Sequence, residues 1–138
     1  FIVLYGGEPT LYPQLFDIFN SHPDVGFMMY TNGTLIDDKM ADKMVEAGNI
    51  SPAISLEGFR ESTDARRGAG TYERIMAAMD RLRERGVIFG ISLTITKQNA
   101  DELFATDSFI DYISLFYIGI NNCAGSTISF ITATFCSI

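Results

Sequence analysis

The feature that most constrains the fold is a repeated alternation between short apolar runs and longer amphipathic stretches. The apolar runs are rich in branched and aromatic residues and fall at residues 1–5, 25–30, 51–56 and 87–95. Each run is short enough to form a strand that is buried on both faces. Because helical patterns separate the runs, the order predicts an α/β fold with a parallel sheet and right-handed crossovers. Both an open doubly wound sheet and part of a β/α barrel fit this order.

The first two helical patterns carry boundary signals that agree with their periodicity. Residues 11–19 place apolar side chains on one side, and Pro13 is tolerable in a first turn. Asp37 or Asp38 can cap a second helix, which is expected to stop at Gly48.

The clearest helix is predicted to begin at Thr71 and to end with basic residues before Gly86. Basic side chains in a last turn suit the negative end of the helix dipole. A fourth helix is expected from Asn99, where Glu102 can complete a capping box.

The composition limits the partners and the compartment. Ten basic and seventeen acidic residues in a chain of 138 give a net charge of -7. Such a chain lacks the basic field that binds nucleic acid or anionic lipid, so neither nucleic acid nor membrane is expected as a partner. Cys123 and Cys136 match neither a metal knuckle nor a redox pair, and free thiols suit the reducing cytoplasm.

The character of the chain changes after Asp111. Residues 112–138 contain no charged side chain and show neither a helical nor a clean alternating period. We therefore expect residues 1–111 to form the α/β core and residues 112–138 to be an uncharged tail of uncertain origin. Our hypothesis is that this tail is not the native continuation of the chain.

Small or polar residues follow each predicted strand. Ligands of parallel α/β sheets bind beyond the carboxyl ends of the strands, where loops and helix N-termini gather. The polar groups at this rim are Gly6-Gly7-Glu8-Pro9 after the first strand, "TNGT" after the second, "SLEG" around the end of the third, and Ser92 and Thr94 along the fourth.

The first of these loops suits an ammonium group. Gly6 and Gly7 expose the backbone to a ligand, Glu8 adds a carboxylate, and Pro9 stiffens the exit. Backbone carbonyls can accept ammonium hydrogens while Glu8 offsets the charge. A tight turn that requires positive φ explains the two glycines equally well, and "YTNGT" is also consistent with a plain turn.

Two adjacent arginines follow the third strand. Arg66 and Arg67 can grip a carboxylate through their planar guanidinium groups. The alternative is a solvated basic pair beside Asp64 and Glu61.

Taken in order, "YGGEP", "YTNGTLID", "SLEG" and "RRGAGTYERIMAAMDRLRERGV" resemble the radical S-adenosylmethionine (radical SAM) superfamily, over residues 1–104. The resemblance implies a partial, TIM-like β/α barrel, here expected to be incomplete at its N-terminus and at its C-terminus. It also implies a 4Fe-4S cluster on a C-x3-C-x2-C loop. In that family, reductive cleavage of SAM yields methionine and a 5'-deoxyadenosyl radical that abstracts hydrogen from the substrate.

The resemblance implies a SAM site made of Gly6, Gly7, Glu8, Pro9, Asn32, Ser55, Arg66, Arg67 and Thr94. In it, the GGEP element receives the methionine ammonium group. Ser55, with Arg66 or Arg67, holds the carboxylate and ribose, and Asn32 and Thr94 line the same cavity.

The chain departs from the family in lacking the C-x3-C-x2-C motif, which the family places upstream of Phe1. Cys123 and Cys136 do not replace it, so the chain is interpreted as a fragment that is inactive alone. The expected partners of the parent enzyme are SAM, an unknown substrate that includes peptides among its candidates, and a reductant such as flavodoxin or ferredoxin. The alternatives are a β/α barrel enzyme that binds a phosphate ester, and an inert α/β fragment or interaction module.

Overall fold

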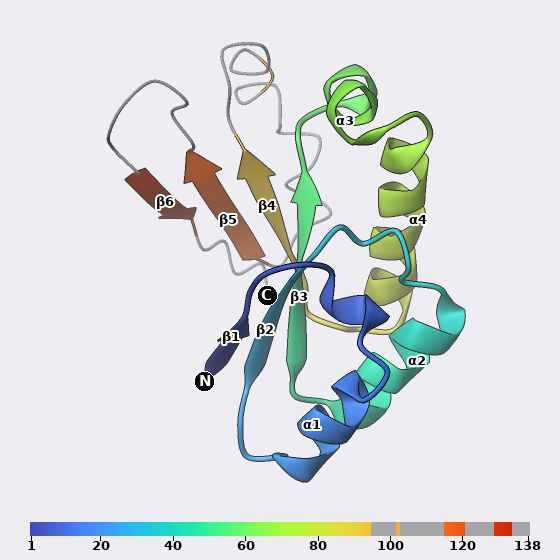
Figure 1. Ribbon diagram of the computed structural model, residues 1–138, viewed down its shortest axis with the longest axis vertical. Coiled ribbons are helices and arrows are strands. Elements are labelled where there is room, and N and C mark those ends of the chain that lie inside the picture. The colour runs from blue at the N-terminus through green and yellow to red at the C-terminus, as the bar shows by residue number, and fades with distance from the viewer. Residues whose placement is uncertain (95–101, 103–114, 121–128, 134–138) are drawn as a thin grey trace.

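A single mixed sheet organises the part of the chain that the structure describes. The computed structural model describes residues 1–94, 102, 115–120 and 129–133. In these ranges the strands follow one another across the sheet in chain order: β1 (Ile2–Leu4), β2 (Phe27–Thr31), β3 (Ile50–Leu56), β4 (Gly90–Thr94), β5 (Leu115–Ile120) and β6 (Ser129–Ala133). Strands β1 to β5 are parallel, which confirms the predicted α/β class, and β6 is antiparallel to β5 (Figure 1).

The helices lie on one side of the sheet (Figure 1). They are η1 (Pro9–Leu11), α1 (Leu15–Ser21), α2 (Asp38–Ala47), α3 (Arg60–Arg67) and α4 (Thr71–Glu84). In the described part of the chain no helix is both long and apolar enough to cross a bilayer.

Two of the predicted helices have the expected boundaries. The Asp37 carboxylate caps α2 by accepting from the backbone N–H of Met40 at 2.8 Å, and Gly48 ends the helix with a φ of 68°. Helix α4 begins at Thr71 as predicted and ends shortly before Gly86.

The helix expected over residues 11–19 begins only at Leu15, as α1, and Leu11 belongs to the separate helix η1. Tyr12 is extended, with φ -78° and ψ 116°, and separates η1 from α1. The physical reason is Pro13, because a residue that precedes proline is sterically excluded from the helical region. Proline therefore delays the start of α1 to Leu15 instead of lying in its first turn.

Helix α3 was not predicted. Its sequence, RESTDARR, has no apolar stripe, and only Thr63 among its residues is buried. Its N-terminus is instead held by Glu102, which accepts a hydrogen bond from the backbone N–H of Phe59 at 2.6 Å. The fourth predicted helix, from Asn99, lies outside the described residues except for Glu102.

The uncharged tail contributes backbone to the sheet. Strands β5 and β6 both fall within residues 112–138, and β5 continues the parallel order beside β4. The antiparallel return of β6 was not expected from a sequence without a clean alternating pattern. The boundary after Asp111 and the origin of the tail stay predictions.

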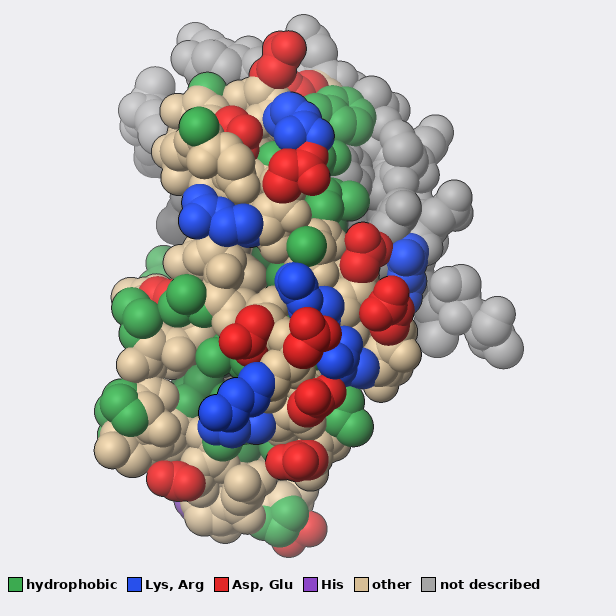
Figure 2. Space-filling view, turned by 90° about the vertical axis from the view of Figure 1, so that its right-hand side faces the viewer, with side chains coloured by type: hydrophobic (Ala, Val, Ile, Leu, Met, Phe, Trp, Pro, Cys, Tyr) green, Lys and Arg blue, Asp and Glu red, His purple; other side chains and the backbone are tan. Residues whose placement is uncertain are grey.

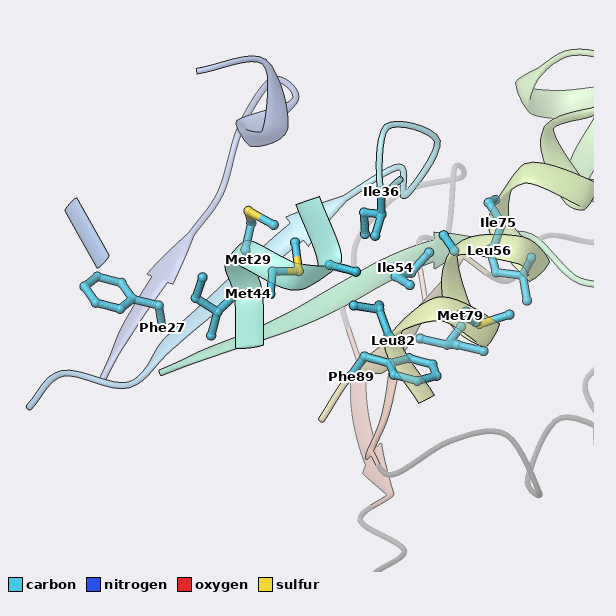
Figure 3. Packing of buried hydrophobic residues seen from close by; sticks show 14 of the residues in the cluster. Phe27, Met29, Ile36, Met44, Ile54, Leu56, Ile75, Met79, Leu82 and Phe89 are labelled. Carbon is cyan, nitrogen blue, oxygen red and sulfur yellow. The ribbon is translucent and has the colours of Figure 1, made fainter. Parts of the chain in front are cut away.

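The hydrophobic core lies between the helices and one face of β2, β3 and β4. Figure 3 shows β2 and β3 side chains packed toward those of α2 and α4. The labelled members are Phe27, Met29, Ile36, Met44, Ile54, Leu56, Ile75, Met79, Leu82 and Phe89. Each such side chain stabilises the fold by about 1.5–3 kcal/mol when fully buried. Because side chains alternate along a strand, the opposite face of the sheet is left for other groups.

Ion pairs join the helices at their outer surface. Figure 2 shows positive and negative side chains interspersed over this face. Arg85, just after α4, donates to Asp38 at 2.8 Å and to Asp42 at 2.6 Å, both on α2. The hydrogen bond to Asp42 is the largest cause of an increase in the pKa of Arg85, so this side chain stays charged and joins the two helices.

Two glycines with nearly equal φ values allow a matched test of the packing. Gly33 has φ +73°, and a Cβ there would lie 2.8 Å from Cγ2 of Ile54, whereas a Cβ at Gly70, with φ +75°, would have no described heavy atom within 4 Å. We expect both alanine substitutions to lower the free energy of unfolding by about 1–2 kcal/mol through the left-handed backbone. Gly33→Ala should lose a further amount of about 1–3 kcal/mol through overpacking. Urea unfolding measures both, and equal losses would contradict this packing.

Candidate functional site

The carboxylate of Glu8 joins the loops that follow β1 and β2. Its Oε1 atom accepts hydrogen bonds from the Thr10 backbone N–H at 3.2 Å, the Thr10 hydroxyl at 2.5 Å and the Thr31 hydroxyl at 2.7 Å. Its Oε2 atom accepts from the backbone N–H of Asn32 at 2.8 Å. Two neighbouring strand ends therefore share one negative group, which also caps η1, where Pro9 is the first residue.

The loop after β2 is fixed by its own side chains as well. Thr31 is buried, and its hydroxyl accepts from the Gly33 N–H at 3.1 Å. The Asn32 Oδ1 atom accepts from the N–H and the hydroxyl of Thr34, at 2.8 and 2.7 Å. This is an Asx turn, so the turn interpretation of "TNGT" is correct, and it fixes the loop beside Glu8.

Open space lies next to the two glycines that precede Glu8. Gly6 and Gly7 have φ values of +108° and +38°, and no heavy atom of the described residues lies within 4 Å of the Cβ that either would carry. The positive φ explains the glycines as turn residues, and the open space leaves their backbone accessible. A carboxylate oxygen can accept more than one hydrogen bond. Within the described contacts Oε2 of Glu8 accepts only one, so it retains capacity for a ligand donor.

Serines occupy neighbouring strands at the same level of the sheet. Ser55 on β3 is paired in register with Ser92 on β4, and both are partly buried. Alternation along the strands puts these serines on the face opposite the core residues Ile54 and Leu56. Thr94 ends β4, and its side chain lies outside the described part of the structure.

Two tyrosines, one beside the glycine pair and one on β2, pack against each other. The rings of Tyr5 and Tyr30 pack edge to face, with centroids 5.9 Å apart. Tyr5 directly precedes the glycine pair and is 88% exposed.

Arg66 and Arg67 bind a carboxylate of their own chain. Glu57, directly after β3, is 1% exposed. Its Oε2 accepts from Arg66 Nη1 at 2.9 Å, while Oε1 accepts from Arg67 Nε at 2.9 Å and from Nη2 at 2.5 Å. Both arginines therefore lie beside the end of β3, and Glu57 is a partner that their sequence pattern did not indicate. The available signal was an acidic residue at the end of a buried strand, where an unpaired charge would be unstable.

The loop from β3 to α3 is held by a second set of contacts. The Thr63 hydroxyl accepts from the Glu57 N–H at 3.3 Å and donates to the Gly58 carbonyl at 3.0 Å. Glu102 accepts from the hydroxyl of Ser62 in addition to the Phe59 N–H. These contacts fix the start of α3, whose last turn carries the arginine pair.

Asp64 caps the next helix. Its carboxylate accepts from the backbone N–H of Tyr72 at 2.8 Å and from that of Gly70 at 3.0 Å, at the start of α4. These two hydrogen bonds, that of Tyr72 foremost, hold the pKa of Asp64 below its ordinary value of 3.8. The alternative of a solvated basic pair beside Asp64 gains no support from these contacts, because the described partner of the arginines is Glu57.

The described residues offer no ligand set for a metal. Among them no group of three or more His, Cys, Asp or Glu side chains is placed to hold an ion. Cys123 and Cys136 lie outside the described residues. The acidic groups of the rim are instead used by hydrogen bonds and ion pairs within the chain.

Comparison with known proteins points to one family. The sequence profile of the radical SAM superfamily matches residues 1–110. Fe-coproporphyrin III synthase of Methanosarcina barkeri is 35% identical over 105 residues, which cover 74% of this chain and 26% of that protein. Mycofactocin maturase MftC of Mycolicibacterium smegmatis is 33% identical over 108 residues, or 75% of this chain and 27% of MftC.

Solved structures share the fold at low sequence identity. Streptococcus suis SuiB bound to S-adenosylmethionine superposes with a TM-score of 0.72 at 19% identity, over 91% of this chain and 30% of SuiB. Native anSMEcpe with bound AdoMet and the Cp18Cys peptide has a TM-score of 0.70 at 21% identity, over 88% and 37%. The chain thus spans about a quarter to two fifths of the length of the relatives and structures that it matches.

The cap at the start of α4 predicts a specific pH dependence. The folded pKa of Asp64 is depressed, so its stabilising contribution is complete above the ordinary value of 3.8 and is lost as the pH falls through the folded pKa. We expect Asp64→Asn to lower the free energy of unfolding at neutral pH. The difference from the wild type should shrink below that value. Urea unfolding across the acid range measures it, and a difference independent of pH would contradict the assignment.

Proposed function

The chain belongs to the radical SAM superfamily, and on that premise we propose that the carboxyl rim of its sheet binds the amino-acid headgroup of S-adenosylmethionine. In the whole enzyme, SAM bound beside a 4Fe-4S cluster would supply a 5'-deoxyadenosyl radical for hydrogen abstraction. The residues described here bind and orient SAM and contain no ligand set for that cluster.

Glu8 and the two glycines carry the proposal. A methionine ammonium group needs acceptors and a negative charge, and Glu8 provides a fixed carboxylate with remaining acceptor capacity on Oε2. The open space beside Gly6 and Gly7 gives the ammonium group room to approach. Because Glu8 is already oriented by Thr10, Thr31 and Asn32, little conformational freedom is lost on binding. This arrangement is the observation that best supports SAM.

The remaining predicted residues surround the other end of the headgroup. We assign the carboxylate and ribose to Ser55 together with one of the two arginines, Arg66 or Arg67, with Asn32 and Thr94 along the cavity. Ser55 lies on the sheet face opposite the core, and the arginines lie in the last turn of α3. Holding both charged ends of the amino acid would fix the sulfonium in one position, which is the requirement for a directed reaction.

The substrate and the reductant belong to the whole protein. A peptide substrate gains support from SuiB, whose structure is also known bound to its precursor peptide SuiA. The names of other relatives, such as pre-heme d1 synthase from Dinoroseobacter shibae, point to heme-related substrates. We propose a peptide substrate, a flavodoxin or ferredoxin reductant, and a cytoplasmic location.

Phosphate-ester binding is the less favourable interpretation of the rim. A phosphate dianion would lie near the carboxylate of Glu8, and like charges repel.

Calorimetric titration of the chain separates these functions. We expect SAM to bind and ribose 5-phosphate not to bind. Glu8→Gln should weaken SAM binding about tenfold or more, since a hydrogen bond to a charged group contributes about 1.5–3 kcal/mol. Glu46→Gln is the matched control, because it makes the same change of charge at an exposed position on α2 and should leave SAM affinity unchanged.

Three results would argue against the proposal. Binding of the phosphate ester in preference to SAM would favour the other barrel chemistry. Binding of neither ligand would favour an inert fragment or interaction module. Equal SAM affinity in the wild type and Glu8→Gln would remove Glu8 from the site.

A further inference from the structure

We propose that Glu57 divides the work of the two adjacent arginines: it fixes Arg67 as part of the fold and positions Arg66 to meet the carboxylate of SAM. This inference rests on the proposed function and assigns different roles to two residues that the sequence leaves equivalent. Glu57 is then a positioning residue, since it acts through Arg66 and not through contact with the ligand.

Arg67 donates two hydrogen bonds from its guanidinium group to Glu57. Its Nε and Nη2 atoms both donate to Oε1, at 2.9 and 2.5 Å, so the fork that would grip a ligand carboxylate already holds this one. The side chain is also the less exposed of the two, at 27%. Removing the partner of a buried carboxylate is strongly destabilising because it leaves the charge uncompensated. Arg67 therefore stabilises the junction between β3 and α3.

Arg66 makes a different contact. It donates to Oε2 of Glu57 through Nη1 at 2.9 Å, and this is the one hydrogen bond of its guanidinium group to the described residues. Its side chain is 48% exposed, and a guanidinium group carries five N–H donors. The single bond limits where the group can lie and leaves its other donors for an anion.

The charges of the three groups also favour an anionic ligand. In the described contacts, Arg66, Arg67 and Glu57 together carry a net charge of +1. Since Glu57 is buried and Arg66 is half exposed, the excess positive charge faces outward from Arg66. A carboxylate that binds Arg66 therefore completes the charge balance of the cluster.

Two nucleosides that differ in the amino-acid headgroup test the division. S-adenosylhomocysteine carries the headgroup and 5'-methylthioadenosine lacks it, so the ratio of their affinities for the full chain reports headgroup recognition alone. We expect Arg66→Gln to lower this ratio about tenfold, because it removes a charge-assisted hydrogen bond. Arg67→Gln should change the ratio by no more than about twofold, because Arg67 makes no contact with the headgroup under this inference. The melting temperature should fall, because the buried carboxylate of Glu57 loses a partner.

Two further variants complete the test. Glu57→Gln should lower both the melting temperature and the ratio, because Arg66 loses its anchor. Arg60→Gln is the matched control: it removes the same charge from the same helix at an exposed pair with Glu73, and neither quantity should change. If Glu57→Gln does not fold, the two arginine variants still decide the matter.

The failures of this inference and of the proposed function are distinguishable. A wild-type chain that binds the two nucleosides equally well would overturn the proposed headgroup site itself. A wild-type chain that prefers S-adenosylhomocysteine, combined with a larger loss of preference in Arg67→Gln than in Arg66→Gln, would overturn only the division of roles. An unchanged ratio in folded Glu57→Gln would remove its positioning role.

Discussion

The carboxyl rim of the sheet depends on carboxylates that follow strand ends and accept hydrogen bonds from donors of the same chain. Glu8 accepts hydrogen bonds from Thr10, Thr31 and Asn32, which lie after two neighbouring strands. This common acceptor joins the two loops to each other. A carboxylate that receives several donors is held in one orientation, so its remaining lone pairs point in a fixed direction. The same group thus stabilises the rim and, under the proposed function, would also orient an acceptor toward a cation.

Much of the fold could be predicted because parallel strands and capped helices leave local signals. The apolar runs gave the first four strands, and Asp37 and Gly48 gave the ends of α2. Tyr12 shows the limit of periodicity, since a proline after it overrides an apolar pattern that otherwise reads as one helix. The antiparallel β6 had no local signal of this kind, because strand direction is set by pairing with β5.

Helix α3 was missed for a related reason. A helix with eight residues and one buried side chain gains little from packing, so its sequence has no apolar stripe to detect. It is stabilised by groups from elsewhere in the chain, with Glu102 at its start and Glu57 bound to its last turn. The pairing of Glu57 with both arginines could not be predicted from the sequence either, because it depends on the position of α3, which carries the arginines in its last turn. Sequence could find the residue types of the site but not their partners.

The positions of the charged groups suggest why a zwitterion would bind in one direction only. Glu8 follows β1 and Glu57 follows β3, with β2 between them, so their strand ends are separated by two strand spacings, or about 10 Å. The first position carries a net negative charge and the second carries the excess positive charge of the arginines. An amino-acid headgroup placed between them gains electrostatic energy in one orientation and loses it when reversed. Glu8 is held by its own loop. Under the proposed function, the longer and more exposed side chain of Arg66 would therefore have to span the distance across β2. Arg66 could bind the carboxylate of the headgroup in that position, because it is held by one hydrogen bond to Glu57 and keeps its other donors. If both arginines used all their donors on Glu57, no donor would remain for that carboxylate.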